Sequence, residues 1–113
     1  MADHIRIAPA PGTWVVRAGG AELGRTGRAM ELREGSYPPV IYFPRENMTM
    51  SFFARSNRAS TCPHKGHASY FSIRTPDAEL PDSVWSYESP KPGVEAIAGY
   101  LAFYTDRVSV GRA

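Results

Sequence analysis

Glycine and proline limit the helices that this chain can form. The chain has 113 residues, and its ten glycines and ten prolines are spread along the whole length. Few segments therefore reach the roughly 11 residues of an average helix without a helix breaker. Short strands joined by turns are the alternative, and 42% hydrophobic residues suffice for one core. The sequence predicts a single β-rich domain over residues 1–113 with one or two short helical turns.

The first half of the chain has clear strand and turn signals. Gly19-Gly20 lies between the apolar residues 14–16 and the segment Ala21-Glu22-Leu23. Because two glycines supply the positive φ angles of a tight turn, we expect a hairpin there, with residues 29–32 continuing the meander. The β-branched and aromatic residues 40–43 predict a buried strand that stops at Pro44.

The second half is expected to alternate strands with irregular segments. One or two helical turns are expected between residues 44 and 58, and one turn at 94–98. Residues 68–73 and 84–87 have strand composition and are expected to pair, while prolines and aspartates predict a loop over 75–82. Residues 100–104 and 108–110 should close the chain as strands around Thr105-Asp106.

No other segment of the chain combines as many potentially reactive side chains as residues 61–70. This segment contains the only cysteine, Cys62, two of the three histidines, His64 and His67, and Lys65. A metal site would use Cys62, His64 and His67, and this donor set suits zinc. Structural zinc sites usually take paired ligands from separate segments, and only His4 lies elsewhere. No metal or cofactor is therefore predicted.

Several segments together resemble the bacterial "domain of unknown function 427" family, sometimes labelled nucleotidyltransferase-like. The segments that carry the resemblance are Tyr37-Pro38-Pro39, Tyr42-Phe43-Pro44-Arg45-Glu46, Thr61-Cys62-Pro63-His64-Lys65-Gly66, Ala68-Ser69-Tyr70, Trp85-Ser86-Tyr87 and Gly99-Tyr100-Leu101-Ala102-Phe103-Tyr104. The resemblance implies a mainly β domain of curved antiparallel sheets, tent-like and similar to Mss4-like folds. The chain lacks a glycine-rich phosphate loop and paired aspartates for magnesium, so nucleotidyl transfer is not expected.

A small-molecule pocket uses more of these residues than any other interpretation. Lys65 would meet an anionic ligand, Gly66 would hinge the loop, and aromatic residues would form walls. The predicted ligand-binding residues are Lys65, Gly66, Tyr70, Trp85, Tyr87, Tyr42 and Arg45. Arg45 either enters the pocket or pairs with Glu46. About half of the aromatic rings are expected to pack in the core instead of contacting a ligand. Glu34 is a candidate general base, while Trp14 and Phe103 are assigned to packing.

Two other functional classes remain open. Cys62 and His64 are candidate catalytic residues, because a thiolate favoured by His64 or Lys65 would serve redox or acyl-transfer chemistry. A lone cysteine is more often a small buried hydrophobe. A non-catalytic interaction module would instead use exposed aromatics and edge strands to bind a partner or to form a homodimer.

Charge and hydropathy limit the binding partners and the cellular compartment that we expect for this chain. A net charge of +2 with no basic run does not predict nucleic-acid binding. No segment approaches the roughly 18 apolar residues of a membrane helix, and residues 1–6 lack the apolar core of a signal peptide. A single cysteine suits a reducing compartment, so we expect a cytoplasmic protein without a membrane partner.

Overall fold

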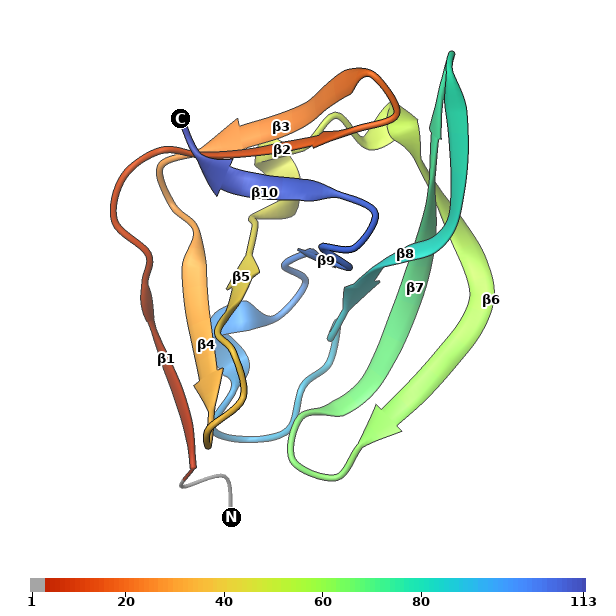
Figure 1. Ribbon diagram of the computed structural model, residues 1–113. Coiled ribbons are helices and arrows are strands. Elements are labelled where there is room, and N and C mark those ends of the chain that lie inside the picture. Colours follow the sequence, from red (N-terminus) through yellow and green to blue (C-terminus); the bar gives the residue numbers. More distant parts are fainter. Residues whose placement is uncertain (1–3) are drawn as a thin grey trace.

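Ten strands in three antiparallel sheets make up most of the chain, in a computed structural model that describes residues 4–113 (Figure 1). The first sheet has the order β1-β4-β5, the second β10-β2-β3 and the third β6-β7-β8-β9. Their bounds are β1 (Ile5–Pro9), β4 (Met30–Glu34), β5 (Val40–Tyr42), β10 (Ser109–Arg112), β2 (Trp14–Ala18), β3 (Ala21–Thr26), β6 (Phe53–Cys62), β7 (Gly66–Thr75), β8 (Ala78–Ser86) and β9 (Ala102–Phe103). The prediction of a mainly β, antiparallel domain is confirmed.

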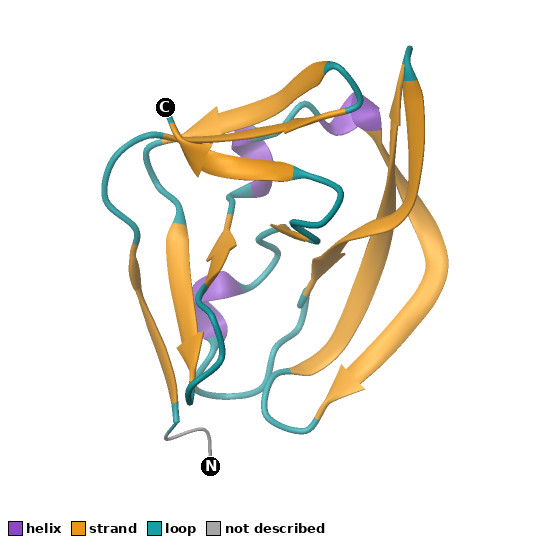
Figure 2. Cartoon of the chain, in the orientation of Figure 1, coloured by secondary structure: helices purple, strands orange, loops and turns teal. Residues whose placement is uncertain are grey.

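Within residues 4–113, helix is confined to three single turns between strands (Figure 2). They are η1 (Arg45–Asn47), η2 (Met50–Phe52) and η3 (Glu95–Ile97). The first two lie in the segment where one or two turns were expected, and the third lies within residues 94–98. No helix within residues 4–113 is long and apolar enough to cross a membrane.

The predicted hairpin at Gly19-Gly20 is confirmed, but the meander beyond it is wrong. Gly19 and Gly20 have φ angles of 56° and 77°, as a type I′ turn requires. β4 pairs with β1 and β5 instead of β3. The reason lies at Thr26, whose hydroxyl accepts a hydrogen bond from the backbone N–H of Arg28 (2.9 Å) and donates one to Asn47 (2.7 Å). These bonds turn the chain out of the second sheet.

The third sheet contains more strand than the sequence predicted. The prediction of a loop over residues 75–82 is wrong, because β7 and β8 are joined by a two-residue turn at Pro76-Asp77. Thr75 closes this turn, since its hydroxyl accepts from the backbone N–H groups of Asp77 and Ala78. Pro81 is tolerated inside β8 because the pairing of β8 with β7 shifts register there and Asp82 adopts a φ of 50°.

The predicted C-terminal strands both form, yet they belong to different sheets. β9 pairs with β8, and β10 pairs with β2. The chain crosses from one sheet to the other around Thr105-Asp106, so the C-terminal end joins the third sheet to the second.

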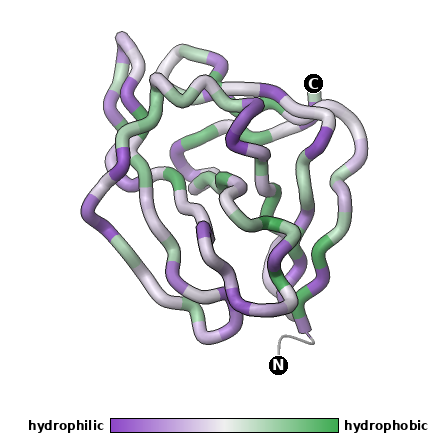
Figure 3. Tube along the Cα trace, turned by 180° about the vertical axis from the view of Figure 1, so that it is seen from behind, coloured by the Kyte–Doolittle hydropathy of each residue, from purple (hydrophilic) through white to green (hydrophobic). Residues whose placement is uncertain are grey.

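Two apolar clusters lie inside the three sheets. One lies between the second and third sheets and includes Val16, Leu23, Phe43, Ile73 and Phe103. The other lies between the first and third sheets and is rich in tyrosine. Seen from behind in Figure 3, hydrophobic segments lie in the middle of the trace and also along β1 at its edge, whereas the bend of β6 at the opposite edge is hydrophilic. The three sheets pack around a shared apolar interior, and a cavity remains where the first and third sheets diverge.

Candidate functional site

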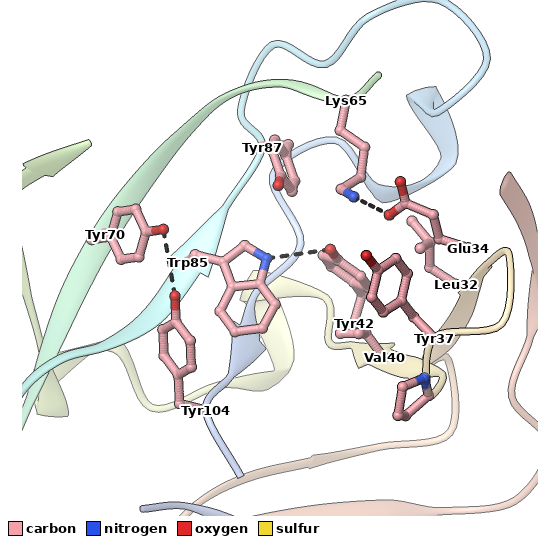
Figure 4. Close-up of a pocket in the computed structure, with 11 residues that line it drawn as sticks. Leu32, Glu34, Tyr37, Val40, Tyr42, Lys65, Tyr70, Trp85, Tyr87 and Tyr104 are labelled. Carbon is pink, nitrogen blue, oxygen red and sulfur yellow. Dashed lines mark hydrogen bonds and ion pairs between the residues drawn. The ribbon is translucent and has the colours of Figure 1, made fainter. Parts of the chain in front are cut away.

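Among the residues that the structure describes, eleven side chains surround a cavity of about 260 Å³ between the first and third sheets (Figure 4). They come from β4, β5 and the loop between them on one side. On the other side they come from β7, β8 and the residues directly before β7, after β8 and after β9. They are Leu32, Glu34, Tyr37, Pro38, Val40, Tyr42, Lys65, Tyr70, Trp85, Tyr87 and Tyr104. Because five of them are tyrosines, we call this space the tyrosine cavity.

An ion pair forms the charged end of the tyrosine cavity. Lys65 lies in the turn between β6 and β7, and its Nζ is 2.6 Å from Oε1 of Glu34, the last residue of β4. Both side chains are largely buried, with 12% and 20% of their surface exposed. The second oxygen of Glu34 lies 3.2 Å from Nε2 of His4. The hydrogen bond from Lys65 lowers the pKa of the Glu34 carboxyl, which is therefore ionised at neutral pH.

The aromatic walls are held in place by hydrogen bonds between their polar tips. Trp85 donates from Nε1 to the Tyr42 hydroxyl over 3.3 Å, and the Tyr104 hydroxyl donates to that of Tyr70 over 3.5 Å. Burial raises the pKa of Tyr42 and of Tyr87 above the ordinary value. These phenols remain neutral, so the cavity offers hydroxyl donors and ring faces with no second negative charge beyond Glu34.

Five of the predicted ligand-binding residues line this single cavity. They are Lys65, Tyr70, Trp85, Tyr87 and Tyr42. Gly66 lies directly beside it as the buried first residue of β7, with a φ of 108° that favours glycine. This backbone conformation directs the turn that presents Lys65. The ligand-binding role of these residues stays a prediction.

Arg45 lies outside the tyrosine cavity, and it does not pair with Glu46. Its guanidinium contacts Glu88 at 3.0 Å and donates to the hydroxyl of Ser86 and the carbonyl of Gly99. Glu46 pairs with Arg28 at 3.0 Å instead. Arg45 therefore joins η1 to the end of β8 and to the segment before β9.

The cysteine and histidines of residues 61–70 point in different directions. Cys62 packs against the tyrosine-rich cluster, whereas His67 is exposed and its Nδ1 is hydrogen-bonded to the Thr61 hydroxyl (2.8 Å). The His64 ring contacts the ring of His4 edge-on, with centroids 4.5 Å apart. Within residues 4–113 no group of three or more His, Cys, Asp or Glu side chains is placed to hold a metal ion. No hydrogen bond among the described residues joins Cys62 to His64 or Lys65.

Five lining residues were missed by sequence reasoning. They are Leu32, Tyr37, Pro38, Val40 and Tyr104. Tyr37-Pro38 was visible as an extended aromatic and proline segment close to Glu34, and Tyr104 ends the aromatic run of residues 100–104. Nothing in the sequence indicates that the first and third sheets bring these two segments to the same cavity. Glu34 was considered as a candidate general base, but its ion pair with Lys65 could not be inferred from the sequence.

Comparison with known proteins gives a family and no activity. The family model described as "Domain of unknown function (DUF427)" matches residues 6–113, nearly the whole chain. No curated protein matches this sequence significantly. The chain belongs to the DUF427 family.

Proposed function

We propose that this DUF427 domain binds a small carboxylate-bearing molecule in the tyrosine cavity. The observation that carries the proposal is the Lys65–Glu34 pair at the end of a cavity whose other lining residues are aromatic or aliphatic. Small-molecule sites typically combine apolar and aromatic walls with a few placed polar groups. The aromatic rings would contact a planar or apolar body, and Lys65 would bind the carboxylate.

The charge of the cavity favours a monoanion over a phosphate. Lys65 is the only lysine or arginine that lines the cavity among the described residues, and it shares its charge with Glu34. A phosphate monoester carries about −1.5 to −2 at neutral pH, which this single shared cation would not neutralise. A carboxylate carries one charge and can accept the N–H donors of Lys65 that Glu34 does not use.

Three probes of similar shape and different charge test the proposal. We expect benzoate to bind more tightly than benzamide, and benzamide more tightly than benzylammonium, in titrations followed by two-dimensional amide NMR. Lys65→Met should weaken benzoate binding at least tenfold. Lys91→Met is the matched control, because Lys91 is an exposed lysine that bonds the Pro63 carbonyl outside the cavity.

A second variant separates binding from folding. Glu34→Gln removes the carboxylate that competes for Lys65, so benzoate should bind several-fold more tightly to it. Tighter binding of benzylammonium than of benzoate to the unmodified protein, or equal benzoate affinity for the Lys65→Met and unmodified proteins, would contradict the proposal.

A further inference from the structure

A second cavity adjoins the tyrosine cavity. It has a volume of about 590 Å³ and lies toward the second sheet. Side chains that line it alone include Trp14 of β2, Ile41 of β5, Phe103 of β9 and Val110 of β10. We call it the outer cavity. Elements of all three sheets thus meet around it.

The two cavities share one wall. Five residues line both of them: Tyr37, Pro38, Val40, Trp85 and Tyr104. The rings of Trp85 and Tyr104 lie 4.7 Å apart between their centroids. Trp85 directs its N–H to Tyr42 in the tyrosine cavity, as Figure 4 shows, so the indole has a polar contact on that side. Tyr37, 74% exposed, completes this wall from the loop between β4 and β5.

The sizes of the two cavities indicate how a ligand would occupy them. Ligand pockets typically measure roughly 300–1,000 Å³. The tyrosine cavity, at about 260 Å³, lies below this range and suits only a small group, whereas the outer cavity, at about 590 Å³, lies within it. A ligand with its charged group at Lys65 therefore has most of its available space on the far side of Trp85 and Tyr37.

The chemistry of the outer cavity suits an uncharged chain. Trp14, Ile41 and Val110 are only partly buried, although they pack against the apolar cluster of the second and third sheets. The one charged residue that lines this cavity, among residues 4–113, is Glu31, and Arg33 already pairs with it at 2.9 Å. Apolar surface left open to water is stabilised when a hydrocarbon covers it.

We propose that the ligand is an elongated amphipathic carboxylate whose charged end meets Lys65 and whose apolar tail passes Trp85 and Tyr37 into the outer cavity. This inference rests on the proposed function, since it takes the carboxylate at Lys65 as its starting point. It adds the class of ligand: a carboxylic acid with an alkyl or arylalkyl tail, in place of a compact polar metabolite.

The test compares benzoate with 4-hexylbenzoate, which adds six carbons to the same charged group. Each buried methylene raises affinity by roughly fourfold in the ideal case. Allowing for partial burial and for the reduced freedom of the chain, we expect 4-hexylbenzoate to bind at least about tenfold more tightly than benzoate. Isothermal titration calorimetry below the micelle-forming concentration measures both affinities.

Two variants fill the outer cavity without touching the tyrosine cavity. Val110→Trp should abolish the gain from the hexyl chain and leave benzoate affinity unchanged, and Ile41→Trp should do the same if the first variant folds poorly. Ser109→Trp is the matched control, because Ser109 is an exposed neighbour on β10 that does not line the cavity.

The failures of the two proposals are distinguishable. If benzoate binds through Lys65 but the hexyl chain brings no gain, or if the gain survives in both filled variants, the outer cavity is not the tail site and the proposed function still stands. If neither probe binds, or if both bind equally well to Lys65→Met, the proposed function fails and the elongated ligand fails with it.

Discussion

The ion pair between Lys65 and Glu34 provides a sharp test of how the first and third sheets are held together. Lys65→Met removes the ammonium and keeps a side chain of similar length. Among residues 4–113, Glu34 then retains the His4 ring, at 3.2 Å, as its remaining side-chain partner, while 20% of the Glu34 side chain is exposed. A solvent-exposed lysine would contribute little to stability, but only 12% of the Lys65 side chain is exposed.

The expected loss of stability lies between that of an exposed pair and that of a buried one. Exposed pairs contribute about 0–1 kcal/mol, and removing one partner of a fully buried pair costs about 3–5 kcal/mol. We expect Lys65→Met to lower the free energy of unfolding by about 1.5–3 kcal/mol. For a domain of this size the loss corresponds to a fall in Tm of roughly 5–15 °C.

Urea denaturation of a double-mutant cycle measures the pair itself. Lys65→Met, Glu34→Gln and the double variant should give a coupling free energy of about 1–2 kcal/mol at pH 7. Because the folded state lowers the pKa of Glu34, the contribution of its charge is complete above the ordinary value of 4.5 and is lost as the pH falls through the folded pKa. The coupling should therefore fade in acid. A coupling near zero at pH 7, or a Lys65→Met loss no larger than that of Lys91→Met, would refute the reasoning.

Three further predictions concern the framework. Gly24→Ala should cost about 1–3 kcal/mol in urea unfolding, because a Cβ there would overlap the Met48 side chain; unchanged stability would contradict this packing. Thr75→Val should lower the free energy of unfolding by about 1–2 kcal/mol. The Thr75 hydroxyl accepts the N–H groups of the β7–β8 turn and donates to the Gly19 carbonyl over 2.8 Å, and valine makes none of these bonds. Thermal unfolding measures the loss, and an unaltered Tm would exclude it. Hydrogen bonding to arginine, chiefly Arg55, lowers the pKa of Glu88 to about 2. The difference in stability between the unmodified protein and Glu88→Gln should therefore be complete above pH 4.5 and shrink as the pH falls toward 2. A difference that is constant with pH would refute this.

Local signals predicted elements well, and long-range pairing less well. Gly19-Gly20 determines a hairpin by the backbone angles of two neighbouring residues, so the sequence alone was sufficient. β6 was missed because its residues include arginines, serines and asparagine, and at the edge of a sheet a strand can be largely polar. The loop expected at residues 75–82 was wrong because Pro81 and Asp82 are compatible with a strand where its register shifts.

The candidate site shows the same division. Lys65, Tyr70, Trp85 and Tyr87 lie on or directly beside β7 and β8, and the pairing of these two strands was expected from the composition of residues 68–73 and 84–87. Tyr37 and its loop come from the first sheet, and their position opposite Trp85 depends on how two sheets diverge. No periodicity or spacing in the sequence encodes the angle between the first and third sheets. Arg45 is close to Tyr42 in sequence and was therefore expected near the pocket. Its side chain extends toward Glu88 instead.

The position of Lys65 links ligand binding to the arrangement of the sheets. The Lys65 ammonium joins the turn between β6 and β7 to the end of β4. A carboxylate ligand would take over part of that hydrogen bonding from Glu34, and its body would interact with walls that belong to both sheets. The weaker bonding of Glu34 would then be offset by the new interactions across the cavity. Glu34→Gln, which weakens the unliganded protein and favours benzoate, should therefore gain more in Tm than the unmodified protein when both are measured with saturating benzoate. An equal or smaller gain would mean that Glu34 does not compete with the ligand for Lys65.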